Sequence, residues 1–452
     1  MPSLHIEREL KFALLPDARA RLEALAPRRR SVASIYYDTP DEVLRRAGMA
    51  LRLRRDGGRW LQTLKCEKRT GGGLAQRAEW EMPVHGRALE LRAFPRDQLP
   101  LDIVALARRL RPRFETRFVR RSGVVSLDGG GEAELAVDSG AIVARGRRTP
   151  IREVELELRS GSPEALLRFA ARLGLPLAYE SKAERGYRLA AGHADAPCKW
   201  RMPAVTADES PTSAFAALFA AALAQAGSNT AGMLRSDDPE YLHQMRIGLR
   251  RARSALRAFA PILRRTKPLK KQLKRFRPVF GIARDWDVLL QKVDSAKLQR
   301  RGAQARRKAR AASPELQAFL LGALKWLHSG PWRDQGLTYK NLGRQALERL
   351  HAEALESRLD SEKRRHRLRI RLKRLRYACE FFVPCFPTSA TRPYIRELER
   401  LQDILGELQD IVVGRRLLGD APVGPRERRV MRTLDAAWPA FAARSPYWRL
   451  EA

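Results

Sequence analysis

Residues Leu4–Phe12 read LHIERELKF, a run in which apolar and charged side chains alternate. In a β-strand, successive side chains point to opposite faces. A strand here would place Glu7, Glu9 and Lys11 on one face, and Ile6, Leu10 and Phe12 on the other. Two carboxylates and an ammonium on one strand face indicate either a solvated surface or a site that holds ions. The remainder of the chain has to distinguish these two interpretations.

The length and composition indicate a folded protein of several domains. A chain of 452 residues is long enough for two or three domains, and the apolar fraction of 44% is typical of a soluble globular protein. No apolar run approaches the length of a membrane span, and the first residues lack the pattern of a secretory signal. The four cysteines show no metal-ligand spacing and suit a reducing compartment, so we expect a cytoplasmic protein.

The chain is strongly basic. Its formal net charge is +37, from 88 basic and 51 acidic residues. Residues 1–200 contain 38 basic and 26 acidic side chains, whereas residues 201–452 contain 50 and 25. A GC-rich genome would favour arginine over lysine but would not produce the excess of charge. We therefore expect a polyanionic partner: nucleic acid, an acidic membrane surface or a phosphate polymer.

The first half of the chain reads mainly as strands. Glycine-rich turns are expected at Gly57–Gly58, Gly71–Gly73 and Gly129–Gly131, and helical patterns at Pro16–Leu25, Leu101–Leu110 and Ser162–Leu173. Besides the opening run, alternating segments occupy Ser34–Asp38, Ala50–Arg54, Trp60–Glu67, Ala78–Val84, Phe114–Arg120, Gly123–Asp128, Glu132–Asp138 and Glu153–Leu158. Eight or so strands with regular turns indicate a barrel or a sandwich.

Several of these segments carry charges on one face and apolar side chains on the other. The charged faces contain Arg52 and Arg54, Glu79 and Glu81, and Glu153, Glu155 and Glu157. In an ordinary barrel, apolar side chains fill the interior and the charged faces are solvated. If helices cover the apolar faces from outside, the charged faces would instead line the lumen. The mixture of signs across the set favours this second arrangement.

Motifs of the first half follow an order that is typical of one family. They are Glu7-x-Glu9-x-Lys11, Tyr36-Tyr37-Asp38-Thr39-Pro40, Arg52-x-Arg54, Lys65, Glu79-x-Glu81, Arg117, Asp138-x-Gly140, Glu153-x-Glu155 and Ser181-Lys182. Over about residues 1–195 the chain resembles CYTH domains. These are the triphosphate tunnel metalloenzymes, which include thiamine triphosphatases, inorganic triphosphatases and class IV adenylate cyclases. The resemblance implies an eight-stranded antiparallel barrel whose tunnel binds a triphosphate and a divalent metal.

The resemblance also implies roles for single residues. Several Lys and Arg side chains must neutralise a triphosphate, and Mg²⁺ or Mn²⁺ prefers carboxylate oxygens. We expect phosphate binding from Lys11, Arg52, Arg54, Lys65, Arg117 and Lys182. We expect metal binding from Glu7, Glu9, Asp138, Glu153 and Glu155, with Glu79 and Glu81 as further candidates. Catalysis is expected to involve Glu7, Glu9, Lys11 and Lys65.

The second half reads as helices and repeats itself. Residues 190–213 contain Gly and Pro and little periodicity, and we predict a linker over 196–209. Residues 243–253 (HQMRIGLRRAR) and 366–376 (HRLRIRLKRLR) then match one pattern, 123 residues apart. Gly281–Asp285 and Gly406–Asp410 match as well, 125 residues apart. We predict a helical domain over 210–452 that is duplicated at about 210–330 and 331–452.

Each repeat places one histidine and three basic residues on one face of a helix. At 100° per residue these four residues fall within a stripe about 80° wide, separate from an apolar stripe. We call the two stripes the basic rails: His243, Arg246, Arg250 and Arg253, and His366, Arg369, Lys373 and Arg376. A single rail would most simply be a solvated face, but its repetition favours a binding role.

The second half resembles the CHAD domain, a histidine-containing helical domain that is often joined to CYTH domains. The resemblance covers about residues 210–450 and includes Asp238–His243 (DPEYLH), Lys373–Tyr377 (KRLRY) and Leu401–Gly406 (LQDILG). It implies two four-helix bundles around a basic channel that binds inorganic polyphosphate through the two rails. The Arg-rich run Lys297–Arg310 lies outside this pattern and could be a solvated helix or loop.

Together these features predict an α+β multidomain protein with an N-terminal tunnel barrel, flanking helices and a C-terminal all-α domain. The leading hypothesis is a Mg²⁺- or Mn²⁺-dependent hydrolase of inorganic triphosphate joined to a polyphosphate-binding domain. A non-catalytic polyphosphate sensor or scaffold, a thiamine triphosphatase and a class IV adenylate cyclase stay open as alternatives. The sequence shows no zinc-finger spacing and no aromatic stacking motif. We therefore expect only weak, salt-sensitive nucleic-acid binding that polyphosphate outcompetes.

Overall fold

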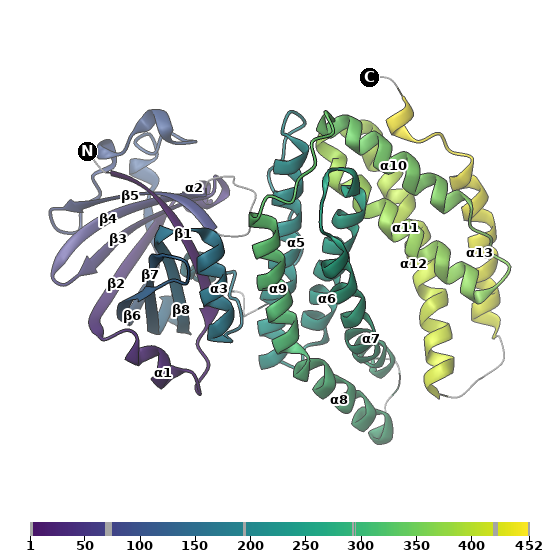
Figure 1. Ribbon diagram of the computed structural model, residues 1–452, viewed down its shortest axis with the longest axis horizontal. Helices are drawn as coiled ribbons and strands as arrows, with labels where there is room; N and C mark the ends of the chain where they lie inside the picture. The colour runs from purple at the N-terminus through teal and green to yellow at the C-terminus, as the bar shows by residue number, and fades with distance from the viewer. Residues whose placement is uncertain are drawn as a thin grey trace. The chain divides into compact units, whose positions relative to one another are not determined.

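The computed structural model describes residues 3–67, 75–192, 196–291, 293, 295–418 and 424–450, and the chain divides into two compact units (Figure 1). The first contains Met1–Cys198 with Gly227–Arg235 and Gln317–Ser329, and the second contains the other residues. Strands dominate the chain up to Cys198, and helices follow. Among the described residues, no helix is both long and apolar enough to cross a membrane.

Eight antiparallel strands of the described chain form a closed barrel, as the sequence predicts. Their order around the barrel is β1–β5–β4–β3–β2–β6–β7–β8, and β1 pairs with β8 to close it. The strands are β1 (Ser3–Ala13), β2 (Arg28–Asp38), β3 (Met49–Asp56), β4 (Arg59–Glu67), β5 (Ala75–Val84), β6 (Arg111–Ser126), β7 (Gly131–Ala144) and β8 (Arg147–Gly161).

The predicted segments Phe114–Arg120 and Gly123–Asp128 are wrong as two strands, because they belong to the single strand β6. Gly123 makes no turn; it pairs with Leu135 of β7. It is needed there because the backbone of Leu25 passes close by, so a Cβ atom at Gly123 would lie 2.1 Å from the Leu25 carbonyl oxygen. The turn expected at Gly71–Gly73 and the Ile6 side chain lie outside the described part of the chain.

Of the three helices predicted in this half, one forms as expected, one is shorter than expected and one does not form. The pattern at Ser162–Leu173 forms α3 (Pro163–Leu173), whose N-terminus is capped by the Ser162 side chain. The pattern at Pro16–Leu25 forms only the short helix α1 (Arg19–Ala24). The helix predicted over Leu101–Leu110 is wrong, since only the 3-10 turn η3 (Ala107–Arg109) forms there. The Asp102 carboxylate accepts the Val104 N–H at 3.0 Å and so holds the segment in a turn.

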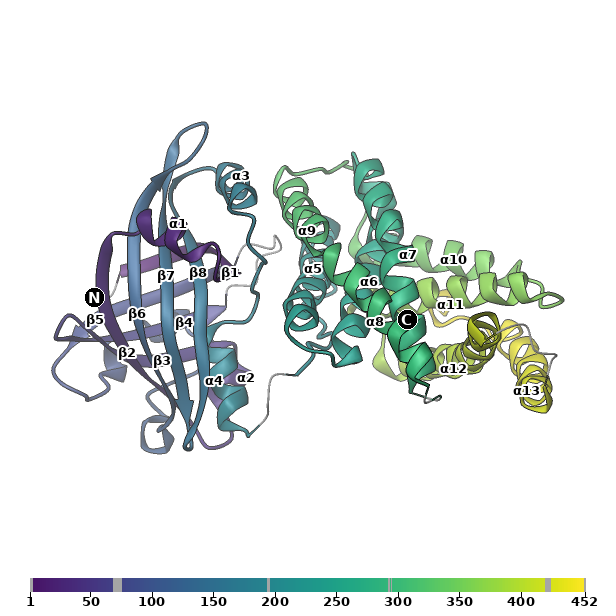
Figure 2. The same cartoon turned by 90° about the horizontal axis from the view of Figure 1, so that it is seen from below.

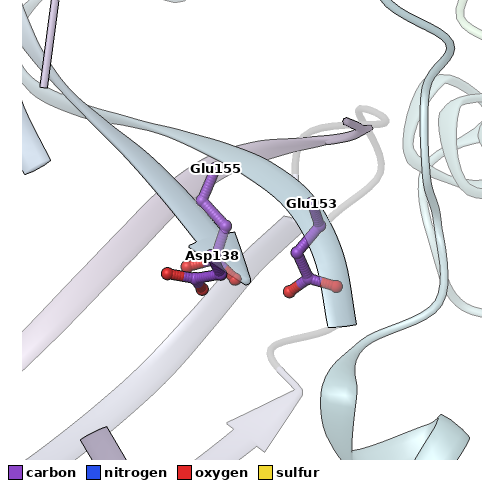
Figure 3. Close-up of side chains that lie close together, drawn as sticks. All are labelled: Asp138, Glu153 and Glu155. Carbon is purple, nitrogen blue, oxygen red and sulfur yellow. The ribbon is translucent and has the colours of Figure 1, made fainter. Parts of the chain in front are cut away.

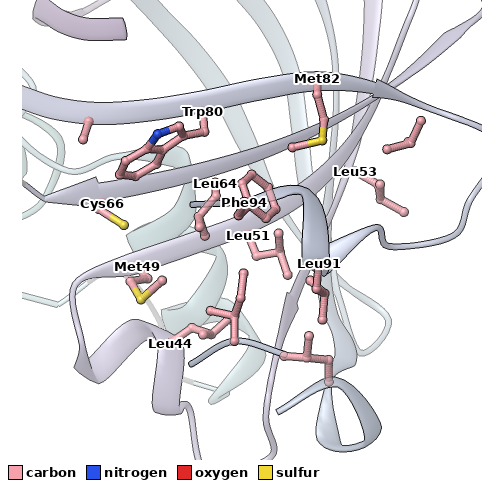
Figure 4. Close-up of a cluster of buried hydrophobic side chains, with 14 residues drawn as sticks. Leu44, Met49, Leu51, Leu53, Leu64, Cys66, Trp80, Met82, Leu91 and Phe94 are labelled. Atoms are coloured by element: carbon pink, nitrogen blue, oxygen red, sulfur yellow. The ribbon is translucent and has the colours of Figure 1, made fainter. Parts of the chain in front are cut away.

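The apolar faces of β3, β4 and β5 point outward and are covered from outside. Leu51, Leu53, Leu64 and Trp80 are buried there in one cluster (Figure 4). The cover consists of α2 (Val43–Arg46) and an irregular segment with the 3-10 turns η1 (Leu91–Ala93), η2 (Arg96–Gln98) and η3. Because the apolar faces are outside, the charged faces of these strands line the lumen, as predicted.

One end of the lumen is apolar and packs against α4 (Lys182–Ala190). The ring of Tyr36 stacks on Phe114 at 4.5 Å, and Tyr187 of α4 meets Phe114 edge to face at 5.1 Å. The Tyr187 hydroxyl donates a hydrogen bond of 2.8 Å to the buried Asp38 carboxylate. Gly186 permits the close contact, because a Cβ atom there would lie 2.1 Å from the Phe114 ring. Lys182 is the first residue of α4, so the packing of this helix fixes the position from which its side chain reaches into the lumen.

The residues after Cys198 that the structure describes form nine α-helices (Figure 1). They are α5 (Pro211–Arg235), α6 (Pro239–Ala258), α7 (Lys267–Leu290), α8 (Ala296–Ala311), α9 (Ser313–His328), α10 (Tyr339–Leu355), α11 (Glu362–Phe382), α12 (Thr388–Leu418) and α13 (Pro425–Ala442). The first copies of the two repeated motifs lie in α6 and α7, and the second copies lie in α11 and α12. The Arg-rich run lies in α8.

The two helices that carry the basic rails have the same features at their ends. The side chains of Asp238 and Ser361 cap the N-termini of α6 and α11, and they are 123 residues apart. At the other ends, Pro261 and Pro384 open 3-10 turns, also 123 residues apart. The repeat therefore preserves the start and the end of the helix that carries each basic rail.

We predict that Gly186→Ala destabilises the barrel by about 1–3 kcal/mol, because the added methyl group collides with the Phe114 ring. Gly322→Ala in α9 is the matched control, because a Cβ atom there meets nothing within 4 Å. This control should stabilise its helix by up to about 1 kcal/mol. Urea unfolding followed by fluorescence measures both changes. A Gly186→Ala variant as stable as the unmodified chain would contradict this packing.

Candidate functional site

The opening strand β1 contributes one wall of the lumen. Glu7 and Glu9 are buried, and the Lys11 side chain is only 11% exposed. The Lys11 ammonium lies 2.8 Å from Glu9 and 2.7 Å from Glu155 of β8, with which Lys11 is paired in register. Lys11 therefore connects the carboxylates of β1 to those of β8.

Three carboxylates converge next to this wall. Asp138 of β7 faces Glu153 of β8 in register, and Glu155 follows two residues along the same strand. One oxygen from each of the three lies within 4.8 Å of the others, and their side chains point toward one another (Figure 3). We call Asp138, Glu153 and Glu155 the carboxylate cluster. Asp138 is fully buried, and Glu153 is 3% exposed.

Cations from two elements neutralise the carboxylate cluster. The Lys182 ammonium lies 2.7 Å from Asp138 and 2.9 Å from Glu155, and it also contacts Glu153. The Arg120 guanidinium of β6 donates two hydrogen bonds, of 2.8 and 2.7 Å, to the two oxygens of Asp138 and another to Glu155. Each of the three carboxylates therefore has a cationic partner.

The opposite wall, formed by β3, β4 and β5, carries further ion pairs. Lys65 lies 2.7 Å from Glu7 and 3.2 Å from Glu79. Arg54 donates two hydrogen bonds, of 2.9 and 2.8 Å, to the oxygens of Glu81. Arg52 likewise faces the Glu79 carboxylate at 3.5 Å. This wall, like the region around the carboxylate cluster, therefore combines cations and carboxylates.

The pKa values show that these opposite charges outweigh the cost of burial. Burial acts to raise the pKa of Asp138, but Lys182 and Arg120 hold it below its ordinary value. Lys11 and Lys182 lower the pKa of Glu155 in the same way. Conversely, the carboxylates raise the pKa of Lys11 and of Lys182 although both are buried. The groups are therefore charged at neutral pH.

The structure places Arg117 outside the lumen, although the sequence analysis expected it to bind phosphate there. Its side chain is 71% exposed on the outer face of β6 and pairs with Glu115 at 2.6 Å. Arg120 occupies the lumen instead, because it is three residues away and so has the opposite orientation. The alternation misled the prediction, since Phe114 and Phe118 look like an outward apolar face but pack in the lumen near α4.

Arg185 is a second lumen residue that the sequence reasoning missed. Its guanidinium lies 3.0 Å from Glu153, one helical turn after Lys182 in α4. The sequence analysis predicted no helix here; had α4 been predicted, the spacing of three residues from Lys182 would have been the signal. By contrast, the predicted ligands Glu7 and Glu9 do not belong to a group of three or more ligating side chains among the described residues.

The carboxylate cluster fits a divalent metal by the chemistry of its donors. Mg²⁺ and Mn²⁺ bind carboxylate oxygens, often from one or two side chains together with water and phosphate. Asp138, Glu153 and Glu155 offer such oxygens close enough together for one ion. The Lys182 ammonium lies among them and provides positive charge at this position.

The two basic rails lie on α6 and α11 and face each other. The cations of one rail lower the pKa of those of the other, as Arg250 does for Lys373 and Arg369 does for Arg246. All eight rail residues are partly buried. We call the space between the rails the basic channel; α7 and α12 contribute Arg284, Asp285 and Asp410 to its surroundings.

Like charges dominate the basic channel. Burial and then Arg250, Arg369 and Arg246 lower the pKa of Lys373 to about 6. Burial and then Arg284 and other cations lower the pKa of His243 to about 3. Two guanidinium Nε atoms, in Arg250 and in Arg369, are buried without a hydrogen-bond partner in the described chain. The channel therefore holds cations that lack enough counter-charge.

Two rail residues contact side chains outside the rails. His366 contacts the Gln409 side chain of α12, and Arg376 bonds to Gln402 at 3.0 Å and pairs with Glu380. Asp285 and Asp410 occupy the ends of the second repeated motif. These two carboxylates only partly balance the channel, since burial raises the pKa of Asp285 despite the nearby Arg246.

Two family models match the chain. The model of the CYTH domain matches residues 5–187, and the model of the CHAD domain matches residues 217–419. An inorganic triphosphatase from Haemophilus influenzae is 32% identical over 199 residues, which are 40% of this chain and 54% of that protein. The chain therefore spans about half the length of this curated relative.

Solved structures are similar to each half. The crystal structure of the CHAD domain from the plant Ricinus communis is 30% identical, covering 55% of this chain and 91% of that chain with a TM-score of 0.46. A Hippeastrum protein, proposed as an adenylyl cyclase and described as having a dominant triphosphatase activity, is 20% identical. It covers 42% of this chain and 97% of its own, with a TM-score of 0.31.

The matched ranges coincide with the barrel and with the helices that carry the basic rails. Both expectations of family are therefore confirmed: the chain consists of a CYTH domain followed by a CHAD domain and is a distant homologue of an inorganic triphosphatase.

Proposed function

We propose that the CYTH barrel hydrolyses inorganic triphosphate with the help of Mg²⁺ or Mn²⁺, and that the CHAD domain binds inorganic polyphosphate. The observation that carries the first part is the buried lumen, in which cations and carboxylates neutralise one another. The relationship to an inorganic triphosphatase supports the same activity. For the second part, the observation is the basic channel with its unbalanced cations.

The charge balance of the lumen explains why a metal would be required. Without substrate, Lys11, Lys182 and Arg120 are paired with carboxylates. A triphosphate can gain these cations only if other positive charge neutralises the carboxylate cluster. Bound there, Mg²⁺ or Mn²⁺ would supply that charge and polarise a phosphoryl oxygen. The cluster would hold the ion, with Glu7 and Glu9 as further candidates.

The lumen cations would then bind and orient the phosphates. The phosphate-binding residues proposed here are those expected from the sequence, except that Arg120 replaces Arg117. They are Lys11, Arg52, Arg54, Lys65, Arg120 and Lys182. Arginine can bind phosphate through two parallel N–H groups, whereas lysine acts as a compact charge. Cations on several strands would surround the phosphate chain and exclude water from its flanks.

The apolar end of the lumen favours an inorganic substrate over a nucleotide. Tyr36, Phe114 and Tyr187 are 2–4% exposed and pack against one another. Their faces are therefore not available to stack on a purine base. A substrate panel with tripolyphosphate, thiamine triphosphate and ATP tests this preference, and faster turnover of ATP than of tripolyphosphate would contradict it.

We predict that Glu155→Gln lowers the rate of phosphate release from tripolyphosphate by at least about 100-fold. The amide removes a ligand of the carboxylate cluster and a partner of Lys11 and Lys182. Glu115→Gln, on the outer face of β6, is the control and should keep its activity. Thermal unfolding of both variants shows whether a lower rate results from the loss of the carboxylate or from a less stable fold. Full hydrolysis by a folded Glu155→Gln variant would rule out this site.

We predict opposite effects for two arginines of the same strand. Arg120→Gln should lower triphosphate hydrolysis by at least about tenfold, because its guanidinium lies in the lumen beside Asp138 and Glu155. Arg117→Gln should change the rate less than twofold, because its side chain points outward. Steady-state rates at saturating Mg²⁺ or Mn²⁺ measure both. The reverse ranking would mean that the orientation of β6 is different.

We predict that polyphosphate binding by the CHAD domain takes up protons and weakens as pH rises from 6 to 8. Lys373, with a pKa of about 6 in the free channel, is mostly neutral at pH 8 and must be protonated to pair with phosphate. At about pH 5 and below it is already mostly charged, so the affinity should level off there. Titration calorimetry in buffers of different ionisation enthalpy measures the uptake.

The Lys373→Arg variant provides the control for this dependence, because its guanidinium remains charged across the range. It should bind with an affinity that changes much less between pH 6 and 8. An unmodified chain that shows no proton uptake would contradict the role of Lys373.

A further inference from the structure

Three neighbouring hollows lie on the outer face of the barrel, in the part where Figure 2 shows β6, β7 and β8 side by side. Their volumes are about 780, 370 and 260 Å³, and Ser139 of β7 lines all three. The largest has a volume within the range of small-molecule sites. We call the three together the outer groove. Residues of β2, β3, β6, β7, β8 and α1 line it, and none of them belongs to the carboxylate cluster.

The outer groove has a floor of small residues and a rim of arginines. Ala33 of β2 lies between Arg55 of β3 and Arg117 of β6 in the register of the sheet. Adjacent strands are about 4.8 Å apart, so these two arginines stand about 10 Å apart across the alanine. Ser139 similarly lies beside Arg152 of β8. The small residues leave the hollow, and the long side chains surround it.

The rim carries more positive charge than its neighbours balance. Arg117 is neutralised by Glu115, while Arg19 and Arg121 share Glu23 of α1. Arg30, which also lines the largest hollow, pairs with Asp56 at 2.9 Å. Within the described residues, no salt bridge reaches the remaining four arginines of the lining, which are all exposed: Arg29, Arg55, Arg148 and Arg152. An anion in the groove would meet several guanidinium groups without displacing a carboxylate.

Two of the arginines are also placed unfavourably for folding alone. Arg29 of β2 and Arg121 of β6 are directly opposite in register, on the outer face of the sheet. Like charges directly opposite on antiparallel strands destabilise a sheet. Glu23 relieves this repulsion only in part, because it also pairs with Arg19. The cost of placing Arg29 opposite Arg121 is explained if their positive charge serves to bind an anion in the outer groove.

We propose that the outer groove binds a chain of inorganic phosphates, as a further anion site formed by barrel residues alone. Guanidinium groups suit phosphate because their N–H groups can bond to two oxygens at once. The lining contains no tyrosine or tryptophan, and its one aromatic residue, Phe118, is buried. A nucleic acid would find phosphate contacts but no surface on which its bases could stack.

The test uses the full chain and end-labelled long-chain polyphosphate, followed by fluorescence anisotropy in EDTA so that metal-dependent hydrolysis is suppressed. A background variant with Arg246→Gln, Arg250→Gln and Arg369→Gln weakens the basic channel. On it, Arg29→Gln, Arg148→Gln and Arg152→Gln remove the groove charge. The matched control removes three exposed charges from α8: Lys297→Gln, Arg300→Gln and Arg301→Gln.

We expect the background variant to retain polyphosphate binding and the groove substitutions to weaken that residual binding at least about tenfold. The α8 control should weaken it less than about threefold. Equal losses in both triple variants would show non-specific attraction and overturn the proposal, as would the absence of residual binding. Tighter binding of a single-stranded RNA of equal charge through the same arginines would also overturn it. If the three background substitutions do not weaken polyphosphate binding, the proposed role of the basic channel is refuted, and the comparison between the groove and α8 variants still tests the outer groove.

Discussion

The ion pairing of buried carboxylates with ammonium and guanidinium groups is the interaction on which the barrel depends. A carboxylate such as Asp138, which is fully buried, is stable as an anion only when opposite charges offset its desolvation. Lys182 and Arg120 provide this at hydrogen-bond distance. Most of the lumen can therefore be polar, while one large apolar cluster of this half lies on the outer faces of the strands and another lies at the end of the lumen next to α4. A barrel with an apolar interior would offer no such site.

The helix α4 links this electrostatic constraint to the fold. Its N-terminus is fixed by a capping box between Ser181 and Glu184, and its last turns pack on the apolar end of the lumen through Tyr187. Lys182 is the first residue after the cap. A single short helix thus closes one end of the barrel and supplies the cation that touches all three members of the carboxylate cluster. Removing either function would disturb the other.

Residue alternation was sufficient to predict the lumen face of β1, β3, β5 and β8, because each carries charges at every second position. It failed on β6, where the lumen face begins with Phe114 and Phe118 and ends with Arg120. No single-strand pattern can reveal that an apolar lumen segment is covered by a helix some 60 residues further along the chain.

The helix predicted over Leu101–Leu110 failed for a related reason. Its apolar residues are buried by wrapping over β3–β5 rather than along one helix face. The repeated basic rails were easier to predict, since a helix face is set by local spacing. Which charges face one another across the channel depends on tertiary structure.

The two domains treat charge in opposite ways, and this difference determines what each can bind. In the barrel, every lumen cation discussed above has a carboxylate partner, so an anion must compete with those pairs unless another cation replaces them. In the basic channel, Arg250, Arg369 and Lys373 repel one another across two helices. An anion entering there relieves repulsion and breaks few pairs. The proposed metal requirement would therefore follow from the barrel's own charges, whereas an anion in the basic channel would need no such ion.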